Sequence, residues 1–342
     1  DAQESRGLGD VYKRQVTKVM TLLLIFEEIE KGNLKLDDTV TTSAHAKSMG
    51  GSQVFLEEGE TQTVETMIKC IVIASGNDAS VAMAEHIAGS EPEFVNAMNK
   101  KAQALGMKNT HFVDCCGLTD SDDHYTTAYD IALMSRELIR KYPEILNYSS
   151  VWMDTITHNT RQGSKEFGLS NTNRLIRTYE GCVGLKTGST SKAKFCVSAV
   201  AKRKGITLIA VVMAAPDSRT RVKDASMLFD YGFAKCSLYT DENPGKLPDL
   251  KVIKGIKEKT TLTFGKTFRC LSTDGTTFDK IKKKLILPNE VKAPVKKGQK
   301  AGELVYYQEN RELGRIPVIY AENVKKAGYL DRLKQTAEEF CL

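Results

Sequence analysis

Hydrophobic residues are most concentrated between residues 16 and 32, where they follow a helical pattern. They recur at three- and four-residue steps, the spacing that places side chains on one helix face: Val19, Leu22, Leu23, Phe26 and Ile29. The first half of this segment is apolar on nearly every side, which a surface helix does not sustain. We therefore expect a helix that runs through the middle of a domain and ends where Gly32 adopts a left-handed conformation.

Further elements are expected up to about residue 233. Helices are predicted at residues 64–74, 79–88, 90–105, 127–141 and 220–233. Thr63, Ser90 and Thr127 are expected N-caps, because Ser and Thr side chains accept hydrogen bonds from first-turn amides. Strands are predicted at residues 151–157, 182–187, 195–201 and 208–215, with a short extended piece at 53–56 and polar loops at 33–49 and 111–126. Helices inserted between the beginning and the end of a sheet indicate a mixed α/β domain, residues 16–236, whose late strands build the sheet.

The pattern changes near residue 237, and the chain is long enough for two domains. Turn residues in the segment 237–250 indicate a linker. Short alternating stretches then predict a small all-β domain over residues 251–322. The last segment, 324–342, is predicted to be an amphipathic helix with these residues on its apolar face: Leu330, Leu333, Ala337 and Phe340.

Composition excludes several classes of protein. With 41% hydrophobic and 27% charged residues the chain is ordinary globular material, and it has no apolar run of about 18 residues or more that could span a bilayer. The net charge of +6 favours anionic surroundings over nucleic acid, because no aromatic-basic platform accompanies it. The eight cysteines include no C-x-x-C pair, so we expect mostly free thiols, and the histidines have no metal-ligand spacing.

Residues 1–15 do not read as the start of a protein. They contain no apolar region, no cleavage site and no strand pattern, and they do not begin with Met. We expect a truncated gene whose 5′ end was replaced by unrelated translated sequence. A processed natural terminus is the alternative.

Three short motifs carry the candidate chemistry. They are Lys18 at the start of the central helix, Ser75-Gly76-Asn77 between two helices, and Lys186-Thr187-Gly188 on a late strand. Each has an ordinary explanation when taken alone. Lys18 can extend to the surface, Ser75 can be a helix N-cap, and Lys186 can be a strand-edge lysine. Their order, however, matches the signature of penicillin-recognising serine enzymes.

Longer stretches make the match more specific. They are Gly51-Ser52-Gln53, SGNDAS from Ser75 to Ser80, AEHIAGSEPEFVNAMNKKAQALGMKNTHFVD, HYTTAYDIALMSREL and NTNRLI…GCVGLKTG. The chain from residue 16 to about 233 resembles the D-alanyl-D-alanine carboxypeptidase family, the low-molecular-mass penicillin-binding proteins of peptidase family S11. The β domain and the final helix resemble that family's C-terminal domain and membrane-associating tail. The resemblance implies a transpeptidase-like fold, a sheet with an inserted helical subdomain.

The resemblance also implies roles for the motif residues. A serine at position 15 attacks the carbonyl between two D-alanines, with Lys18 as general base. Ser75 relays a proton to the leaving D-alanine, and Asn77 holds Lys18 and the substrate amide. The terminal carboxylate and the strand-edge substrate are bound by Lys186, Thr187, Gly188 and Arg221. Backbone amides of residue 15 and Ser189 form the oxyanion hole. No metal or cofactor is required.

The sequence departs from the family at the nucleophile. The family motif is S-x-x-K, and the position three residues before Lys18 is Gln15. A carboxamide cannot become an alkoxide or carry an acyl-enzyme ester, so we expect the chain as printed to be inactive. The family's first strand hairpin is also missing. In a smaller departure, Lys194 stands where the family usually has Gly.

Two functions compete. The leading hypothesis is a serine carboxypeptidase that trims peptidoglycan stem peptides and is acylated by β-lactams. The rival is a non-catalytic protein that binds stem peptides in the cell wall, with Lys186 and Arg221 for their carboxylates. A β-lactamase is less favoured, because the β domain resembles the carboxypeptidases. Both hypotheses place the protein outside the cytoplasm, on the wall side of the membrane, with possible peripheral membrane contact through the final helix.

Overall fold

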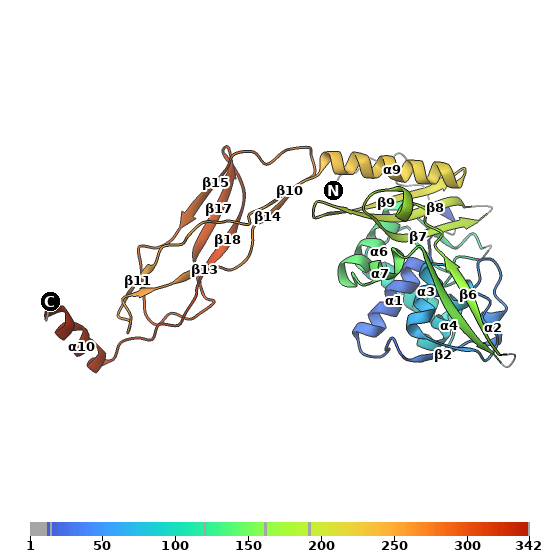
Figure 1. The fold of residues 1–342 in the computed structure, drawn as a ribbon, viewed down its shortest axis with the longest axis horizontal. Coiled ribbons are helices and arrows are strands. Elements are labelled where there is room, and N and C mark those ends of the chain that lie inside the picture. Colours follow the sequence, from blue (N-terminus) through green and yellow to red (C-terminus); the bar gives the residue numbers. More distant parts are fainter. Residues whose placement is uncertain (1–11, 14–15, 120, 161–162, 191–192, 341–342) are drawn as a thin grey trace. The chain divides into compact units, whose positions relative to one another are not determined.

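The computed structural model describes residues 12–13, 16–119, 121–160, 163–190 and 193–340. The chain divides into two compact units, Asp1–Phe233 and Ala234–Leu342, which are described separately here (Figure 1). Gln15, the position of the expected nucleophile, lies outside the described residues.

The first unit is built around α1 (Lys18–Glu30). The first nine residues of this helix, from Lys18 to Phe26, are all buried, as the apolar pattern predicts. Gly32 follows the helix with φ +76°, a conformation that costs glycine little because it has no Cβ. The predicted central helix and its end are thus confirmed.

Capped helices surround α1: α3 (Val64–Val72), α4 (Asn77–Ala88), α5 (Glu91–Ala104) and α6 (Ala128–Lys141). Thr63, Ser90 and Thr127 each accept a hydrogen bond from the amide three residues later, so the three predicted N-caps are confirmed. Short helices connect these elements: α2 (Ala44–Lys47), α7 (Ile145–Ser149) and α8 (Leu175–Thr178).

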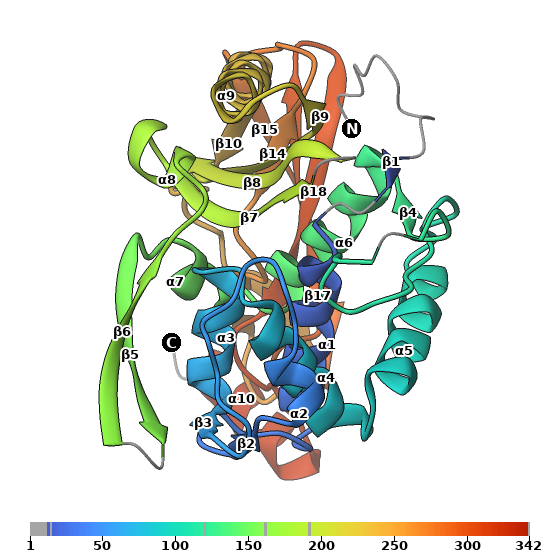
Figure 2. The ribbon, with the colours of Figure 1, turned by 90° about the vertical axis from the view of Figure 1, so that its right-hand side faces the viewer.

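The main sheet has three antiparallel strands in the order β7-β8-β9: β7 (Cys182–Thr190), β8 (Lys194–Arg203) and β9 (Ile206–Ala215). Phe229 of α9 (Ser218–Lys235) packs against one face of the sheet with Ala199. Val200, the next residue, belongs to the core shared with the helices around α1. Figure 2 shows α9 on one side of the sheet and the helical subdomain on the other. The late strands therefore build the sheet of a mixed α/β unit, as predicted.

Three local predictions for this unit are wrong. The segment 33–49 is more than a polar loop, because it contains α2 and the strand β2 (Thr39–Thr41), which pairs with β3 (Thr61–Thr63). The segment 53–56 is not extended throughout, because Phe55 has φ +62°, and the amides of Val54 and Leu56 bond to the carboxylate of Asp78. The segment 111–126 ends in the short strand β4 (Tyr125–Thr126), which pairs with β1 (Tyr12–Lys13).

A separate two-stranded hairpin consists of β5 (Met153–Thr160) and β6 (Gly163–Ser170). The first strand is predicted from the sequence and the second is not. β6 contains two glycines and several exposed polar residues, and its only buried residue is Leu169. Such a strand lacks the apolar alternation on which strand prediction depends.

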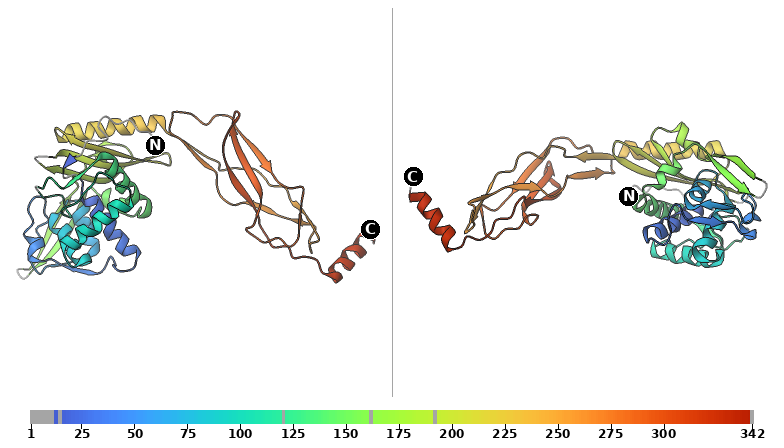
Figure 3. Two further views of the ribbon diagram at one scale, coloured as in Figure 1. Left: turned by 180° about the vertical axis from the view of Figure 1, so that it is seen from behind. Right: turned by 60° about the horizontal axis from the view of Figure 1, so that its bottom comes forward.

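The second unit consists of strands and one helix (Figure 3). Its largest sheet has the order β13-β18-β17-β15: β13 (Leu262–Phe264), β18 (Arg311–Tyr320), β17 (Lys300–Gln308) and β15 (Ile281–Ile286). A smaller sheet has the order β12-β11-β16: β12 (Lys259–Thr260), β11 (Leu250–Ile253) and β16 (Glu290–Lys292). The rings of Phe268 and Tyr306 stack 3.8 Å apart in the core.

Two predictions for the second unit need correction. Part of the expected linker forms β10 (Ser237–Thr240), which pairs with β14 (Arg269–Ser272). The final helix, α10 (Tyr329–Phe340), begins five residues later than predicted. Val324 is fully buried and pairs with Val295, so residues just before α10 belong to the β structure.

Within the described residues no helix is long and apolar enough to cross a membrane. The seven cysteines in the described part of the chain are free thiols, as expected, and Cys341 lies outside it.

Candidate active site

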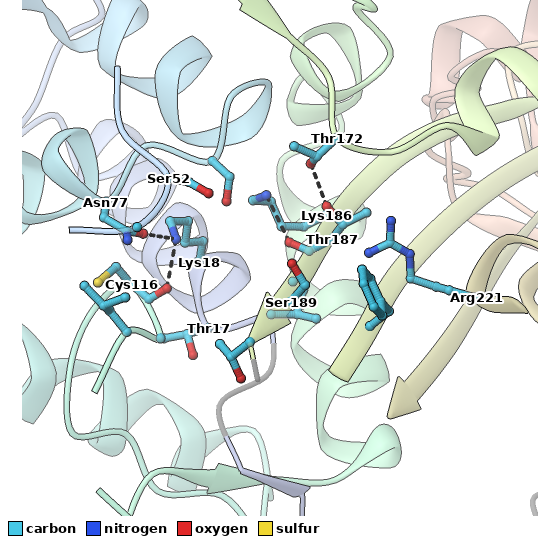
Figure 4. Close-up of a pocket in the computed structure, with 18 residues that line it drawn as sticks. Thr17, Lys18, Ser52, Asn77, Cys116, Thr172, Lys186, Thr187, Ser189 and Arg221 are labelled. Carbon is cyan, nitrogen blue, oxygen red and sulfur yellow. Dashed lines mark hydrogen bonds between the residues drawn. The ribbon is translucent and has the colours of Figure 1, made fainter. Parts of the chain in front are cut away.

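One cavity of about 370 Å³ collects the three motifs. It lies between the N-terminus of α1, the loop before α4 and the strand β7 (Figure 4). Every described residue of the predicted site lines it: Lys18, Ser75, Asn77, Lys186, Thr187, Gly188, Ser189 and Arg221. Residues far apart in the sequence are thus brought together as the motif order predicts.

Lys18 does not extend to the surface, since only 6% of it is exposed. Its Nζ donates hydrogen bonds to Asn77 Oδ1 at 2.6 Å and to the carbonyl oxygen of Cys116 at 2.8 Å. Burial lowers the pKa of Lys18, and the opposing influence of nearby groups, among them Asp114 and Asp78, is smaller. A lysine held this way is suited to act as a base, because a lowered pKa makes its neutral form more accessible.

Asn77 and Asp78 attach a second loop to the site. The Asn77 amide donates to the carbonyl of Ser52 at 2.8 Å, and Asn77 Nδ2 donates to the carbonyl of Gly50 at 2.7 Å. The buried carboxylate of Asp78 accepts bonds from Val54 and Leu56 further along the loop. These bonds position Gly51 and Ser52, which form part of the cavity wall.

Ser75 is not the N-cap of α4, because that position is taken by Gly76. Ser75 has φ +63°, a left-handed conformation that costs a non-glycine residue on the order of 1 kcal/mol or more. Its side chain is half-buried and lines the cavity. The alternative in which Ser75 only caps a helix is therefore wrong.

The opposite wall is β7. Lys186 is almost fully buried, and its Nζ donates to the carbonyl of Thr187 at 3.1 Å. Burial lowers the pKa of Lys186 well below its usual range, and the positive charges of Lys18 and Arg221 lower it further. The hydroxyl of Thr187 lies 2.5 Å from that of Thr172. Figure 4 shows Lys186, Thr187 and Ser189 facing the Lys18 group across the cavity.

Arg221 is buried at the edge of the cavity, whereas Arg219 is exposed. The Arg221 guanidinium donates to the carbonyl of Cys196 at 3.2 Å and lies 5.7 Å from the Phe195 ring centroid. Burial lowers its pKa. Among the described residues that line the cavity, three have basic side chains and none is a carboxylate, so the site is suited to bind an anion.

Several contributors are missed by sequence reasoning. Thr172 lies in a segment noted for its resemblance but given no role, and its contact with Thr187 needs the folded chain. The carbonyl of Cys116, which accepts a bond from Lys18, is a backbone group, so its role cannot be predicted from the residue type. His124 is buried with Nε2 2.8 Å from the hydroxyl of Thr17, a residue that also lines the cavity.

A buried lysine at the start of a central helix, a Ser-x-Asn loop and a Lys-Thr-Gly strand enclosing one anion-binding cavity define the class of penicillin-recognising serine enzymes. Comparison with known proteins narrows this class. A family model described as D-alanyl-D-alanine carboxypeptidase matches residues 11–217, and one described as penicillin-binding protein 5, C-terminal domain, matches residues 241–326. The chain belongs to the D-alanyl-D-alanine carboxypeptidase family, peptidase family S11.

Individual relatives support this family assignment. The D-alanyl-D-alanine carboxypeptidase DacF of Bacillus subtilis is 44% identical over 322 residues, which cover 94% of this chain and 82% of DacF. The crystal structure of penicillin binding protein 5 from Haemophilus influenzae is 27% identical with a TM-score of 0.68, covering 94% of this chain and 93% of that one. The Streptomyces K15 DD-transpeptidase is 28% identical with a TM-score of 0.63, covering 68% and 91%. The predicted resemblance and fold class are confirmed.

Proposed function

We propose that this site is that of a serine-type D-Ala-D-Ala carboxypeptidase and that it binds the D-Ala-D-Ala terminus of peptidoglycan stem peptides. The observation that carries this is the cavity with three basic side chains and no carboxylate among its described lining residues. Relatives that are named carboxypeptidases support the substrate class.

The terminal carboxylate would lie between Lys186, Thr187 and Arg221. β7 is an edge strand of the sheet as the structure describes it, since only β8 pairs with it. A peptide can therefore add to its free edge at Gly188 and Ser189, with main-chain hydrogen bonds for affinity. The amide of Ser189 would serve the oxyanion hole together with that of residue 15.

The catalytic roles follow from the Lys18 group. In a chain with serine at position 15, the neutral Lys18 amine removes the hydroxyl proton as the oxygen attacks the D-Ala carbonyl. Asn77 holds the amine in place, and Ser75 passes a proton to the leaving amino group. The C–N bond breaks, D-alanine leaves, and water then hydrolyses the ester. β-Lactams would acylate the same oxygen.

With Gln15 the chain as printed binds the peptide but forms no ester. The second candidate function, a non-catalytic protein that binds stem peptides in the wall, is favoured by this one residue. Both functions require the same cationic cavity and differ only at the nucleophile.

The binding function is tested by calorimetry with a peptide that ends in D-Ala-D-Ala and with its C-terminal amide. We expect the free acid to bind roughly tenfold more tightly, because charge-assisted hydrogen bonds to a carboxylate are the stronger ones. Replacing Arg221→Gln should remove most of this preference. Equal affinity for acid and amide would refute the proposed carboxylate site.

We further propose an extracytoplasmic location in which α10 lies in the plane of an anionic membrane surface. Tyr329, Leu330 and Leu333 are exposed by 78%, 79% and 52%. Exposed basic residues lie on and beside the helix: Lys325, Lys326, Arg332 and Lys334. This arrangement is typical of interfacial helices, although the acidic residues of α10 weaken the attraction.

A further inference from the structure

A second cavity of about 410 Å³ lies in the first unit, and the proposed reaction does not use it. It is bounded by the second half of α1, the helices α3 and α7 and the start of β5, all of which can be followed in Figure 2. None of its lining residues lines the catalytic cavity: Phe26, Ile29, Leu36, Glu65, Lys69, Ile73, Glu144, Asn147, Tyr148, Val151 and Asp154.

The floor of this second cavity is apolar and partly aromatic. Phe26 and Ile73 are buried, and Ile29 and Val151 are half-buried beside them. The ring of Phe26 lies 6.4 Å from that of Tyr148, so two aromatic side chains form one wall. A floor of this kind takes up a hydrocarbon or aromatic group.

The rim carries an excess of negative charge. Lys69 and Asp154 form an ion pair at 3.2 Å and so neutralise each other. Glu65 and Glu144 have no cationic partner within the described part of the chain, and the hydroxyl of Tyr148 donates to Glu65 at 3.4 Å. Glu144 lines the same cavity, and burial together with the charges of Glu65 and Glu144 raises the pKa of the Tyr148 hydroxyl.

We propose that this cavity binds organic cations with an apolar body, such as aryl-alkyl ammonium compounds. The apolar body would lie on Phe26 and Ile73, and the ammonium group would lie between Glu65 and Glu144 at the face of Tyr148. Carboxylates and an aromatic ring together are the groups that recognise ammonium ions. An anion is disfavoured, because the one cation of the rim, Lys69, is already paired.

The experiment uses the full chain as printed and needs no catalysis, so its outcome is independent of the carboxypeptidase proposal. Calorimetry at pH 7 compares 4-phenylbutylamine with 4-phenylbutanol, which has the same apolar body and no charge. We expect the amine to bind roughly tenfold more tightly than the alcohol. Added salt should weaken only the amine, because both carboxylates are exposed and are therefore screened.

Variants locate the site. Glu65→Gln with Glu144→Gln should weaken the amine by roughly tenfold and leave the alcohol unchanged. Glu93→Gln, an exposed acid on α5 outside the cavity, is the matched control and should change nothing. Asn147→Lys places an ammonium group at the rim and should block the amine. Thermal unfolding checks that each variant is folded. Equal binding of amine and alcohol, no saturable binding, or an equal effect of Glu93→Gln would overturn the proposal.

Discussion

Lys18 and Lys186 show how a few buried residues set the chemistry of the site. Both lysines are buried, and burial lowers the pKa of each. A buried ammonium is costly unless it is paired or loses its proton. The described residues that line the cavity provide no carboxylate partner, so a bound anion would stabilise the charged form of these amines.

At the residue scale the first prediction concerns Gln15. The chain as printed should form no covalent adduct with a fluorescent penicillin, because an amide side chain supplies no nucleophile. The measurement is fluorescence on a denaturing gel, with a serine-containing member of the family as positive control. A labelled band that disappears when the protein is boiled beforehand would contradict this.

Lys194 provides a second prediction. It is exposed and has φ +54°, a left-handed conformation. Lys194→Gly should raise the free energy of unfolding by about 1 kcal/mol, because glycine adopts this conformation without strain. Lys202→Gly, at an exposed position of the same strand β8, is the control and should destabilise. Urea denaturation measures both, and a loss of stability in both variants would rule out strain at Lys194.

At the element scale, local signals predict the helices well. The N-caps at Thr63, Ser90 and Thr127 and the end at Gly32 depend on neighbours within a few residues, which the sequence displays directly. The start of α4 is less well predicted. The helix begins at Asn77, whose amide donates to the carbonyl of Ser52 in a distant loop.

Elements held by distant contacts are the ones that the sequence does not reveal. β6 has little apolar alternation, and it exists because it pairs with β5 along its whole length. Likewise the motif residues are found from the sequence, whereas Thr172 and the Cys116 carbonyl become visible only when the chain is folded. The type of a residue does not reveal which strand it pairs with or which contacts its backbone atoms make.

The loop at residues 50–56 yields a prediction at this scale. Asp78→Asn should destabilise the protein by about 1–3 kcal/mol, because an amide cannot accept as many bonds from the buried amides of Val54 and Leu56. Hydrogen exchange at these two amides should accelerate more than exchange in α5. Asp37→Asn, an exposed acid, is the control. Unchanged protection of Val54 and Leu56 would show that Asp78 does not hold the loop.

At the scale of the whole molecule, the two units have separate cores. The hydrophobic cores of the first unit are formed by residues of α1 and of the β7–β9 sheet. The second unit has two cores, one that contains Val324 and one that contains Tyr306. The helix α10 adds little to either core, since Tyr329, Leu330 and Leu333 are exposed. Its one described bond to the β structure runs from Gln335 to the Gly255 carbonyl.

Removal of α10 tests its proposed membrane role. A chain that ends at Gly328 keeps Val324 in the core of the second unit and should bind anionic vesicles roughly tenfold more weakly. Cosedimentation with anionic and neutral vesicles measures this. A chain that keeps α10 but carries Leu271→Asp, an exposed apolar residue on β14, should bind normally. Full binding by the shortened chain would refute the anchor.

The low pKa of Lys186 has a consequence for ligand capture. A carboxylate that arrives beside this amine favours its charged form, so the pKa rises and the complex takes a proton from the solvent. Affinity for D-Ala-D-Ala peptides should therefore fall as pH rises from the lowered pKa of the free site towards that of the complex. Calorimetric heats should differ between buffers of different ionisation enthalpy, and Lys186→Met should reduce that difference. Peptide binding would then be coupled to proton uptake, and the site would bind the peptide more tightly at lower pH.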